Sequence, residues 1–305
     1  MINTIHTKNL RWIDLTNPGP KEISWLRQNY NFHELHFQAV AEHQQRPHLD
    51  EGNGYDFLVL LFPVYLRQTK EIIPGEVDFF IGNNFLITAH YGEINTLRTM
   101  FDQSKTSSTF RNLLMQQGPG HLLYKILESL FRRSYPILDH MSEDVTQIEK
   151  DIFKRLDNAM LYHIALMRRN IIEFRKMMKT HGYVLEKLPK RRPGYLTFAE
   201  SKVYYRDLLE YSHNIWDILE ALKETMDTFQ DTNQTLATQR LNEITKFISL
   251  FSAIIIPATL VAFWFGVGVE NKPFRHHPNG FWIVGILMIL ASLTTFLIFR
   301  RKKWF

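Results

Sequence analysis

The stretch that decides the fold is Phe247–Val269, with the sequence FISLFSAIIIPATLVAFWFGVGV. It contains no charged residue over 23 positions, and about 20 apolar residues in a helix cross the hydrocarbon core of a bilayer. Mostly hydroxyl-bearing and small residues recur within and just before it at a spacing of three or four. This set, the polar stripe, comprises Thr245, Ser249, Ser252, Ile256, Thr259, Phe263 and Gly266.

Two interpretations of the polar stripe remain open. Lipid offers hydroxyl groups no hydrogen-bond partner, so the stripe is expected to face protein or water. It could pack against other helices, with hydroxyls bonded to their own backbone. It could also line a water-filled path, because the spacing is compatible with both.

A second apolar segment defines the predicted topology. Phe281–Phe299 follows the short polar loop 270–280 and leads into the basic run Arg300–Lys303. Loops rich in Lys and Arg stay on the cytoplasmic side, which predicts cytoplasmic N- and C-termini and an external loop. Two helices are too few to enclose a channel, so a pore would require a symmetric ring of subunits.

The composition excludes several other classes of protein. The chain of 305 residues has no cysteine, which rules out disulfides and thiolate zinc sites. Its net charge of +5 is concentrated in Lys190–Arg192 and Arg300–Lys303, without an RNA-binding motif, so nucleic acid is not an expected partner. The first residues have no long apolar run, and no cleaved signal peptide is expected.

The remainder of the chain is predicted to form an α+β domain followed by helices. Apolar, β-branched runs separated by Gly, Asn and Pro predict strands at Leu10–Leu15, Tyr55–Tyr65, Val77–Ile81 and Asn84–His90. The predicted divisions are a cytoplasmic α/β domain (1–120), a helical hairpin (121–199), a stalk helix (200–246), a first membrane helix (247–269), an external loop (270–280), a second membrane helix (281–299) and a basic tail (300–305). Pro136 is expected to kink or break the long helix near the start of the hairpin.

The stalk helix has neither Pro nor Gly from Glu200 until Pro257. Its apolar residues suggest a heptad seam: Tyr204, Leu208, Tyr211, Ile215, Ile218, Leu222, Thr225, Phe229, Thr232 and Leu236. The seam predicts either partner copies around this helix or an intrachain hairpin with Asp139–His181, and both could hold. Acidic residues along the same helix include Asp207, Glu220, Asp227 and Asp231; they could form a solvated face, and Asp231 could ring the inner mouth of a pore.

Other chemistry has little support in the sequence. His33-Glu34-Leu35-His36 departs from the His-Glu-x-x-His zinc pattern because its histidines are three positions apart. With His43 and His48 nearby, a metal cluster is conceivable, beside the alternative of an ordinary polar helix face. Neither a phosphate-binding loop nor a Ser, His and Asp arrangement stands out, and no enzymatic activity is expected.

Taken end to end, the chain resembles the CorA family of divalent-cation channels. The resemblance rests on WIDL at Trp12–Leu15, the segments His33–Tyr65 and Val77–His90, and the order of the two C-terminal helices. It also rests on Asn242-Glu243, Lys246, Pro257, Thr259 and the terminal Arg300-Arg301-Lys302-Lys303-Trp304.

The resemblance implies a funnel-shaped homopentamer in the bacterial inner membrane, conducting Mg²⁺, Co²⁺, Ni²⁺ or Zn²⁺ without a covalent cofactor. By position it implies a pore lined by Asn242, Ile248, Ser252, Ile256, Thr259 and Gly266, with Ile248 and Ile256 as apolar constrictions and Asp231 at the cytoplasmic mouth. Asp207 matches an acid of the family's intersubunit magnesium-sensing site, whose partner position falls on Leu66.

The chain departs from the family at the outer mouth. Where the family has Tyr-Gly-Met-Asn, this chain has Phe265-Gly266-Val267-Gly268, followed by Glu270 in a different loop. Gly268 offers no side-chain acceptor, so Gly266, Val267, Gly268 and Glu270 form the expected selectivity mouth. We therefore expect a cation channel with altered selectivity; the alternative is a non-conducting, membrane-anchored oligomeric scaffold or regulator.

Overall fold

The computed structural model describes residues 1–42, 46–91, 94–152, 158–190, 196, 198–268, 273–274 and 277–302. Contacts divide the chain into two units, Met1–Gln230 and Asp231–Phe305. Glu270, His43, Lys303 and Trp304 lie outside the described residues.

The first unit is built on one six-stranded sheet with the order β1-β2-β6-β5-β4-β3. The strands are β1 (Ile2–His6), β2 (Arg11–Thr16), β3 (His48–Gly52), β4 (Tyr55–Leu66), β5 (Glu71–Gly82) and β6 (Phe85–His90). β2 and β6 pair in parallel and all other neighbours pair antiparallel. The central strands are apolar almost throughout because both faces of the sheet are covered.

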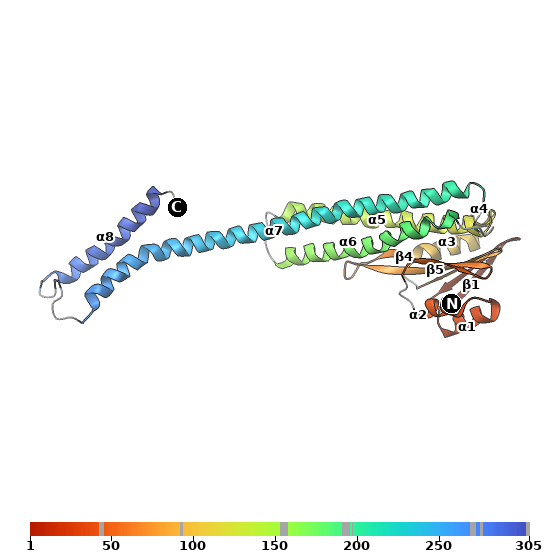
Figure 1. Ribbon diagram of the computed structural model, residues 1–305, viewed down its shortest axis with the longest axis horizontal. Helices are drawn as coiled ribbons and strands as arrows, with labels where there is room; N and C mark the ends of the chain where they lie inside the picture. Colours follow the sequence, from red (N-terminus) through yellow and green to blue (C-terminus); the bar gives the residue numbers. More distant parts are fainter. Residues whose placement is uncertain are drawn as a thin grey trace. The chain divides into compact units, whose positions relative to one another are not determined.

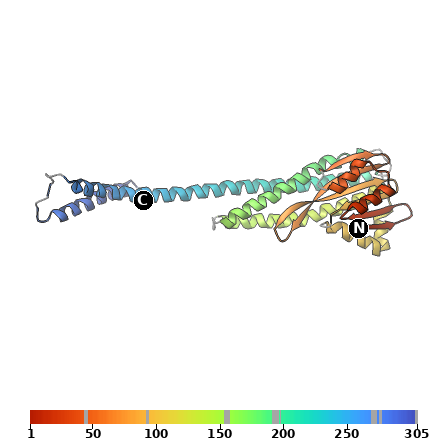
Figure 2. The same cartoon turned by 90° about the horizontal axis from the view of Figure 1, so that it is seen from below.

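Helices form a layer on each face of this sheet (Figures 1 and 2). One face packs against α1 (Pro20–Asn29) and α2 (Glu34–Glu42) through a smaller apolar core. The other face contributes to a core that continues through five helices. They are α3 (Asn95–Thr106), α4 (Ser108–Met115), α5 (Pro119–Ile152), α6 (Asn158–Leu185) and the first part of α7 (Ser201–Gly266).

Several predicted elements need correction. β1 and β3 were not predicted because they are edge strands with one buried residue each, so they lack the apolar alternation that marks a half-buried strand. β5 begins at Glu71 rather than Val77 and runs through Pro74, whose missing N–H the sheet tolerates there. Pro136 does not end its helix, since α5 is continuous from Pro119 to Ile152.

The seam on α7 is partly wrong in register. The buried residues of this helix are Tyr205, Leu208, Ser212, Ile215, Leu219, Leu222, Met226 and Phe229. Four of the ten predicted seam positions, Leu208, Ile215, Leu222 and Phe229, are therefore correct. Tyr204, Tyr211 and Ile218 lie at the edge of the seam and are only partly buried. The seam belongs to the same apolar core as residues of α5 and α6, so the intrachain hairpin accounts for it.

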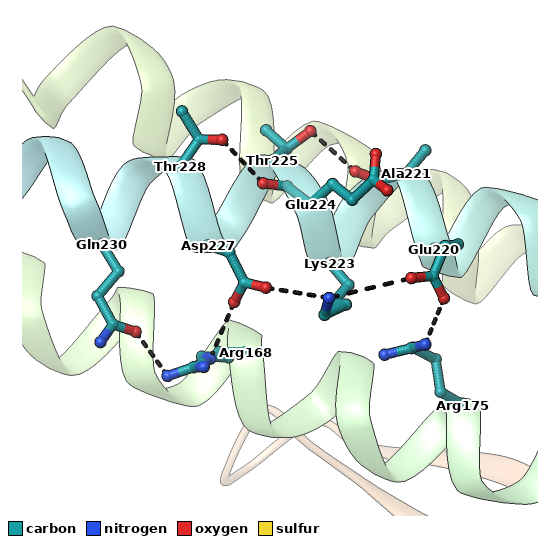
Figure 3. Close-up of polar contacts among 10 residues, drawn as sticks. All are labelled: Arg168, Arg175, Glu220, Ala221, Lys223, Glu224, Thr225, Asp227, Thr228 and Gln230. Carbon is teal, nitrogen blue, oxygen red and sulfur yellow. Dashed lines mark hydrogen bonds and ion pairs between the residues drawn. The ribbon is translucent and has the colours of Figure 1, made fainter.

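Ion pairs join α7 to α6 beside the buried seam (Figure 3). Arg175 pairs with Glu220, and its guanidinium lies 4.9 Å from the ring centre of Trp216. Arg168 lies 3.3 Å from Asp227. Glu220 and Asp227 thus form part of an intrachain network rather than a simple solvated face. Partly exposed pairs add little stability individually, but a ladder of them favours one register between two helices.

The corrected register predicts different costs for two neighbouring substitutions. Leu219→Ala should lower the free energy of unfolding by about 3 kcal/mol, because it empties a fully buried position. Ile218→Ala should cost about 1 kcal/mol, because Ile218 is only partly buried. Chemical denaturation of the purified chain measures both. A larger cost for Ile218→Ala would contradict the register.

A second prediction concerns His181, which is fully buried between Phe62 and Phe131. Burial lowers the pKa of His181 to about 3, against a smaller opposite effect of the Leu61 backbone. His181 therefore binds a proton below about pH 6.5 in the unfolded chain, but only near pH 3 in the folded chain. This group's contribution to stability is complete above that pH and is lost progressively as the pH falls toward 3.

Between pH 7 and pH 5, the His181→Leu variant should lose about 2 kcal/mol less unfolding free energy than the unsubstituted chain. Denaturation at the two pH values measures this difference. The exposed His140 provides the control, since His140→Gln should leave the pH dependence unchanged. Equal losses in the His181→Leu variant and the unsubstituted chain would contradict the account.

Candidate functional site

The second unit contains the membrane-length part of α7 and the helix α8 (Gly280–Arg301). Within the described residues, α7 and α8 are the two helices long and apolar enough to cross a membrane. α7 ends at Gly266 and α8 begins at Gly280, close to the predicted limits of both membrane segments.

α8 packs on one face of α7. The hydroxyl of Ser292 donates a hydrogen bond of 2.9 Å to the main-chain oxygen of Ile254. Ile254 and Ala258 share a groove with Met288, Ser292 and neighbouring apolar residues of α8. Toward the end of α7, Phe265 lies 6.3 Å, ring centre to ring centre, from Phe274.

Pro257 lies within α7 beside the Ser292 bond. Because proline has no N–H, the carbonyl of Ala253 loses its helical partner, and the proline ring crowds the turn before it. Carbonyls in such a turn become available to side chains of a neighbouring helix. The bond from Ser292 goes to the neighbouring carbonyl, that of Ile254, and it holds α8 on a defined face of α7.

Most of the polar stripe lies on the other side of α7, whereas Gly266 at its end lines a hollow with Phe281 and Met288 of α8. At about 100° per residue, Ile254, Ala258, Val261 and Phe265 cluster on one face, and the centre of the polar stripe lies about 180° from it. Phe263, within the stripe, keeps 74% of its surface exposed. Packing against α8 therefore does not explain the stripe. Bonding to its own helix does occur, since the hydroxyl of Thr259 donates to the oxygen of Ile256 over 2.8 Å.

All other predicted pore-lining positions also lie on α7 in the second unit. Asn242, Thr245, Ile248, Ser249, Ile256 and Gly266 are exposed, and Ser252 is half-buried. Asp231 is exposed as well, and its main-chain oxygen accepts the hydroxyl of Thr235. Glu270 lies outside the described residues.

The predicted selectivity mouth is the C-terminal end of α7. The N–H of Val267 still bonds to the oxygen of Phe263 over 3.1 Å, as a last helical turn does. Gly266 and Gly268 both have open space where a side chain would begin. Three of the last four carbonyls of a helix lack intrahelical partners at such an end, so the chemistry available here is that of main-chain oxygens.

The predicted sensing residue Asp207 has a partner within its own chain. Tyr124 donates a hydrogen bond of 3.0 Å to its carboxylate. Burial, reinforced by this bond, raises the pKa of the Tyr124 hydroxyl, so the tyrosine remains a donor.

Leu66 lies far from Asp207 within one subunit. Leu66 on β4 lies opposite Glu71 on β5, and Glu71 forms an ion pair with Arg169 of α6. The preceding residue of α6, Arg168, bonds to Gln230 of α7, so Leu66 lies near the level of Gln230. Asp207 is 23 residues before Gln230, which is about 35 Å along a helix, so Leu66 and Asp207 do not meet within one chain.

The role of Ser292 in packing α8 against α7 was not predicted from the sequence. Its signal was a hydroxyl inside an otherwise apolar segment, the same signal that revealed the polar stripe. A single hydroxyl has no periodicity, however, so only the structure assigns it to helix packing.

Comparisons with known proteins agree with this arrangement. A family model described as CorA-like Mg²⁺ transporter protein matches residues 7–301. The cobalt/magnesium transport protein CorA of Methanocaldococcus jannaschii is 23% identical over 295 residues, which cover 97% of this chain and 91% of that protein. The zinc transport protein ZntB of Yersinia pseudotuberculosis serotype O:1b is 19% identical over 298 residues, covering 96% and 87%.

The fold is also that of a solved structure. The complete structure of the CorA magnesium transporter from Methanocaldococcus jannaschii matches with a TM-score of 0.84 and 22% identity, over 99% of this chain and 94% of that one. The family model spans the sheet, the helical layer and both membrane-length helices. The chain therefore belongs to the CorA-like Mg²⁺ transporter family.

Proposed function

We propose that this chain transports divalent metal cations across the bacterial inner membrane, along the axis of a homopentamer. The observation that carries the proposal is the position of the polar stripe on the face of α7 that α8 leaves uncovered. Hydroxyls facing lipid would have only their own helix as a partner, as Thr259 does, whereas hydroxyls facing a shared axis would also meet water and ions.

The ring of subunits follows from the number of helices. One α7 and one α8 cannot surround a path, so copies of α7 must stand around the axis with α8 between them and lipid. The number five comes from the family resemblance. In this arrangement the sheet unit and both termini are cytoplasmic, because the basic end of α8 stays inside.

The residues along the proposed ion path would have different roles at different depths. The ring of Asp231 carboxylates would raise the local cation concentration at the inner mouth. Rings of Ile248 and Ile256 would form apolar constrictions that gate by excluding water. Ser252 and Thr259 would hydrogen-bond to the water shell of a hydrated ion, which suits Mg²⁺ because it gives up its water reluctantly.

At the outer mouth, main-chain oxygens of Gly266, Val267 and Gly268 would meet the ion in place of a side-chain amide. Carbonyl oxygens are ligands of hard cations, but a ring of them on flexible glycines holds a hydrated ion less specifically than fixed amides. We therefore propose a selectivity that extends beyond Mg²⁺ to Co²⁺, Ni²⁺ or Zn²⁺. The alternative, a non-conducting scaffold, is an outcome of the flux measurement that follows.

A matched pair of substitutions tests the path. Thr259→Leu should reduce ion uptake into proteoliposomes at least about tenfold, because a ring of hydrogen-bonding groups becomes apolar. Thr294→Leu is the control: it makes the same change on α8, where the hydroxyl also bonds to its own helix.

Uptake of Mg²⁺, Co²⁺, Ni²⁺ and Zn²⁺ should be measured separately, with native mass spectrometry to count subunits. Equal effects of the two substitutions would contradict a path along the stripe. If an intact pentamer conducts none of the ions, the scaffold replaces the transporter.

A separate prediction concerns the mouth. Gly268→Asn should fit without strain, since nothing lies within 4 Å of the position of the new side chain. It should raise Mg²⁺ uptake relative to Zn²⁺ about tenfold, because amide groups would bond to the tightly held water of Mg²⁺. The ratio of initial uptake rates measures this change. An unchanged ratio would mean that the mouth does not select the ion.

A further inference from the structure

A cluster of two histidines and an aspartate lies in the first unit, apart from the proposed ion path. His36 belongs to the first turn of α2, and His48 and Asp50 belong to β3. The two β3 residues are two positions apart and therefore share a face of the strand. That face looks toward α2, since both histidine rings contact the ring of Phe57, at centre distances of 4.5 Å for His36 and 5.6 Å for His48.

Both histidines approach the same carboxylate oxygen. Nε2 of His36 and Nε2 of His48 each lie 3.7 Å from Oδ2 of Asp50. Two ligands of a tetrahedral metal at bond lengths of about 2.0–2.1 Å are about 3.3 Å apart. Among the described residues, no three such side chains are already gathered at binding distance. Both nitrogen–oxygen distances are about 0.4 Å longer than a shared metal ion would require.

A hydrogen bond at Nδ1 of His48 leaves Nε2 of the same ring available as a metal ligand. Nδ1 of His48 lies 2.7 Å from the main-chain oxygen of Arg46. A carbonyl oxygen only accepts, so Nδ1 carries a proton and Nε2 is the ring nitrogen left to bind a metal. Nε2 faces the Asp50 carboxylate, so a cation between the two atoms would have a ligand on each side.

A hydrogen bond at Nδ1 also orients the ring of His36. Its Nδ1 lies 2.7 Å from the hydroxyl of Tyr55, which also accepts the main-chain N–H of His33 over 2.8 Å. With a metal on Nε2, Nδ1 would donate to this hydroxyl, as metal-bound histidines commonly do to an oxygen behind them.

We propose that His36, His48 and Asp50 form a binding site for a zinc-class transition metal in the first unit. Two imidazoles and one carboxylate suit Zn²⁺, Co²⁺ or Ni²⁺ and disfavour Mg²⁺, which prefers oxygen ligands. His36 and Asp50 line an open hollow of about 740 Å³, so an ion can enter from solvent and retain water as a fourth ligand. The site is independent of the ion path and would let the chain distinguish a transition metal from Mg²⁺.

Cobalt provides the probe, because Co²⁺ with four or five ligands absorbs visible light far more strongly than hydrated, six-coordinate Co²⁺. The untagged, chelator-treated full-length protein in detergent should develop this absorption with one equivalent of Co²⁺ per chain. Zn²⁺ should abolish it and excess Mg²⁺ should not. His48→Gln and Asp50→Asn should each weaken Co²⁺ binding about 100-fold or more.

The control is His140→Gln, which alters an exposed His–carboxylate pair with Nδ1 3.5 Å from Glu143 and should leave the absorption unchanged. His48 and Asp50 are partly exposed, so their substitution should preserve the fold, as the melting temperature will verify. Thr259→Leu should retain Co²⁺ binding, which separates this site from the path. Undiminished absorption in His48→Gln and Asp50→Asn, or the spectrum of hydrated Co²⁺ alone, would overturn the proposal.

Discussion

The position of α8 on one face of α7 is the constraint on which the proposed function depends. Ser292 bonds to the oxygen of Ile254 where Pro257 disturbs the helical pattern, and the apolar groove around this bond excludes the stripe side of α7. Once that face is occupied, α8 offers the hydroxyls of the polar stripe no hydrogen-bond partner within the described residues, and Thr259 bonds to its own helix. In the function that we propose, the stripe faces water, ions and further copies of α7.

In the first unit, α7 packs against other helices of its own chain. There α7 buries a heptad stripe from Tyr205 to Phe229 against its own chain, and its acidic residues pair with Arg168 and Arg175 of α6. The apolar face of this part is therefore satisfied within one subunit. The oligomerisation that we propose therefore concerns the second unit, where the polar stripe is exposed.

The sequence predicted what depends on local composition. Two membrane segments follow from long apolar runs, and the described residues contain two helices long and apolar enough to cross a membrane. The polar stripe follows from helical spacing, and its role as a pore lining stays a prediction. Other features depend on which distant surface covers a residue. They include the edge strands β1 and β3 and the burial of Leu219 rather than Ile218. The sequence suggested His36 and His48 as members of a conceivable metal cluster but did not suggest Asp50, because Asp50 lies on a strand that was not predicted.

The most direct test of the ion path uses the absence of cysteine from the chain. Single cysteines introduced by Thr259→Cys and Val261→Cys lie about 160° apart on α7 at nearly the same depth. In proteoliposomes, a positively charged, water-soluble thiol reagent should modify the T259C variant rapidly and block its uptake of divalent cations. The V261C variant should react slowly and keep its flux. Equal reactivity, or faster reaction of V261C with loss of flux, would contradict a water-filled path along the polar stripe.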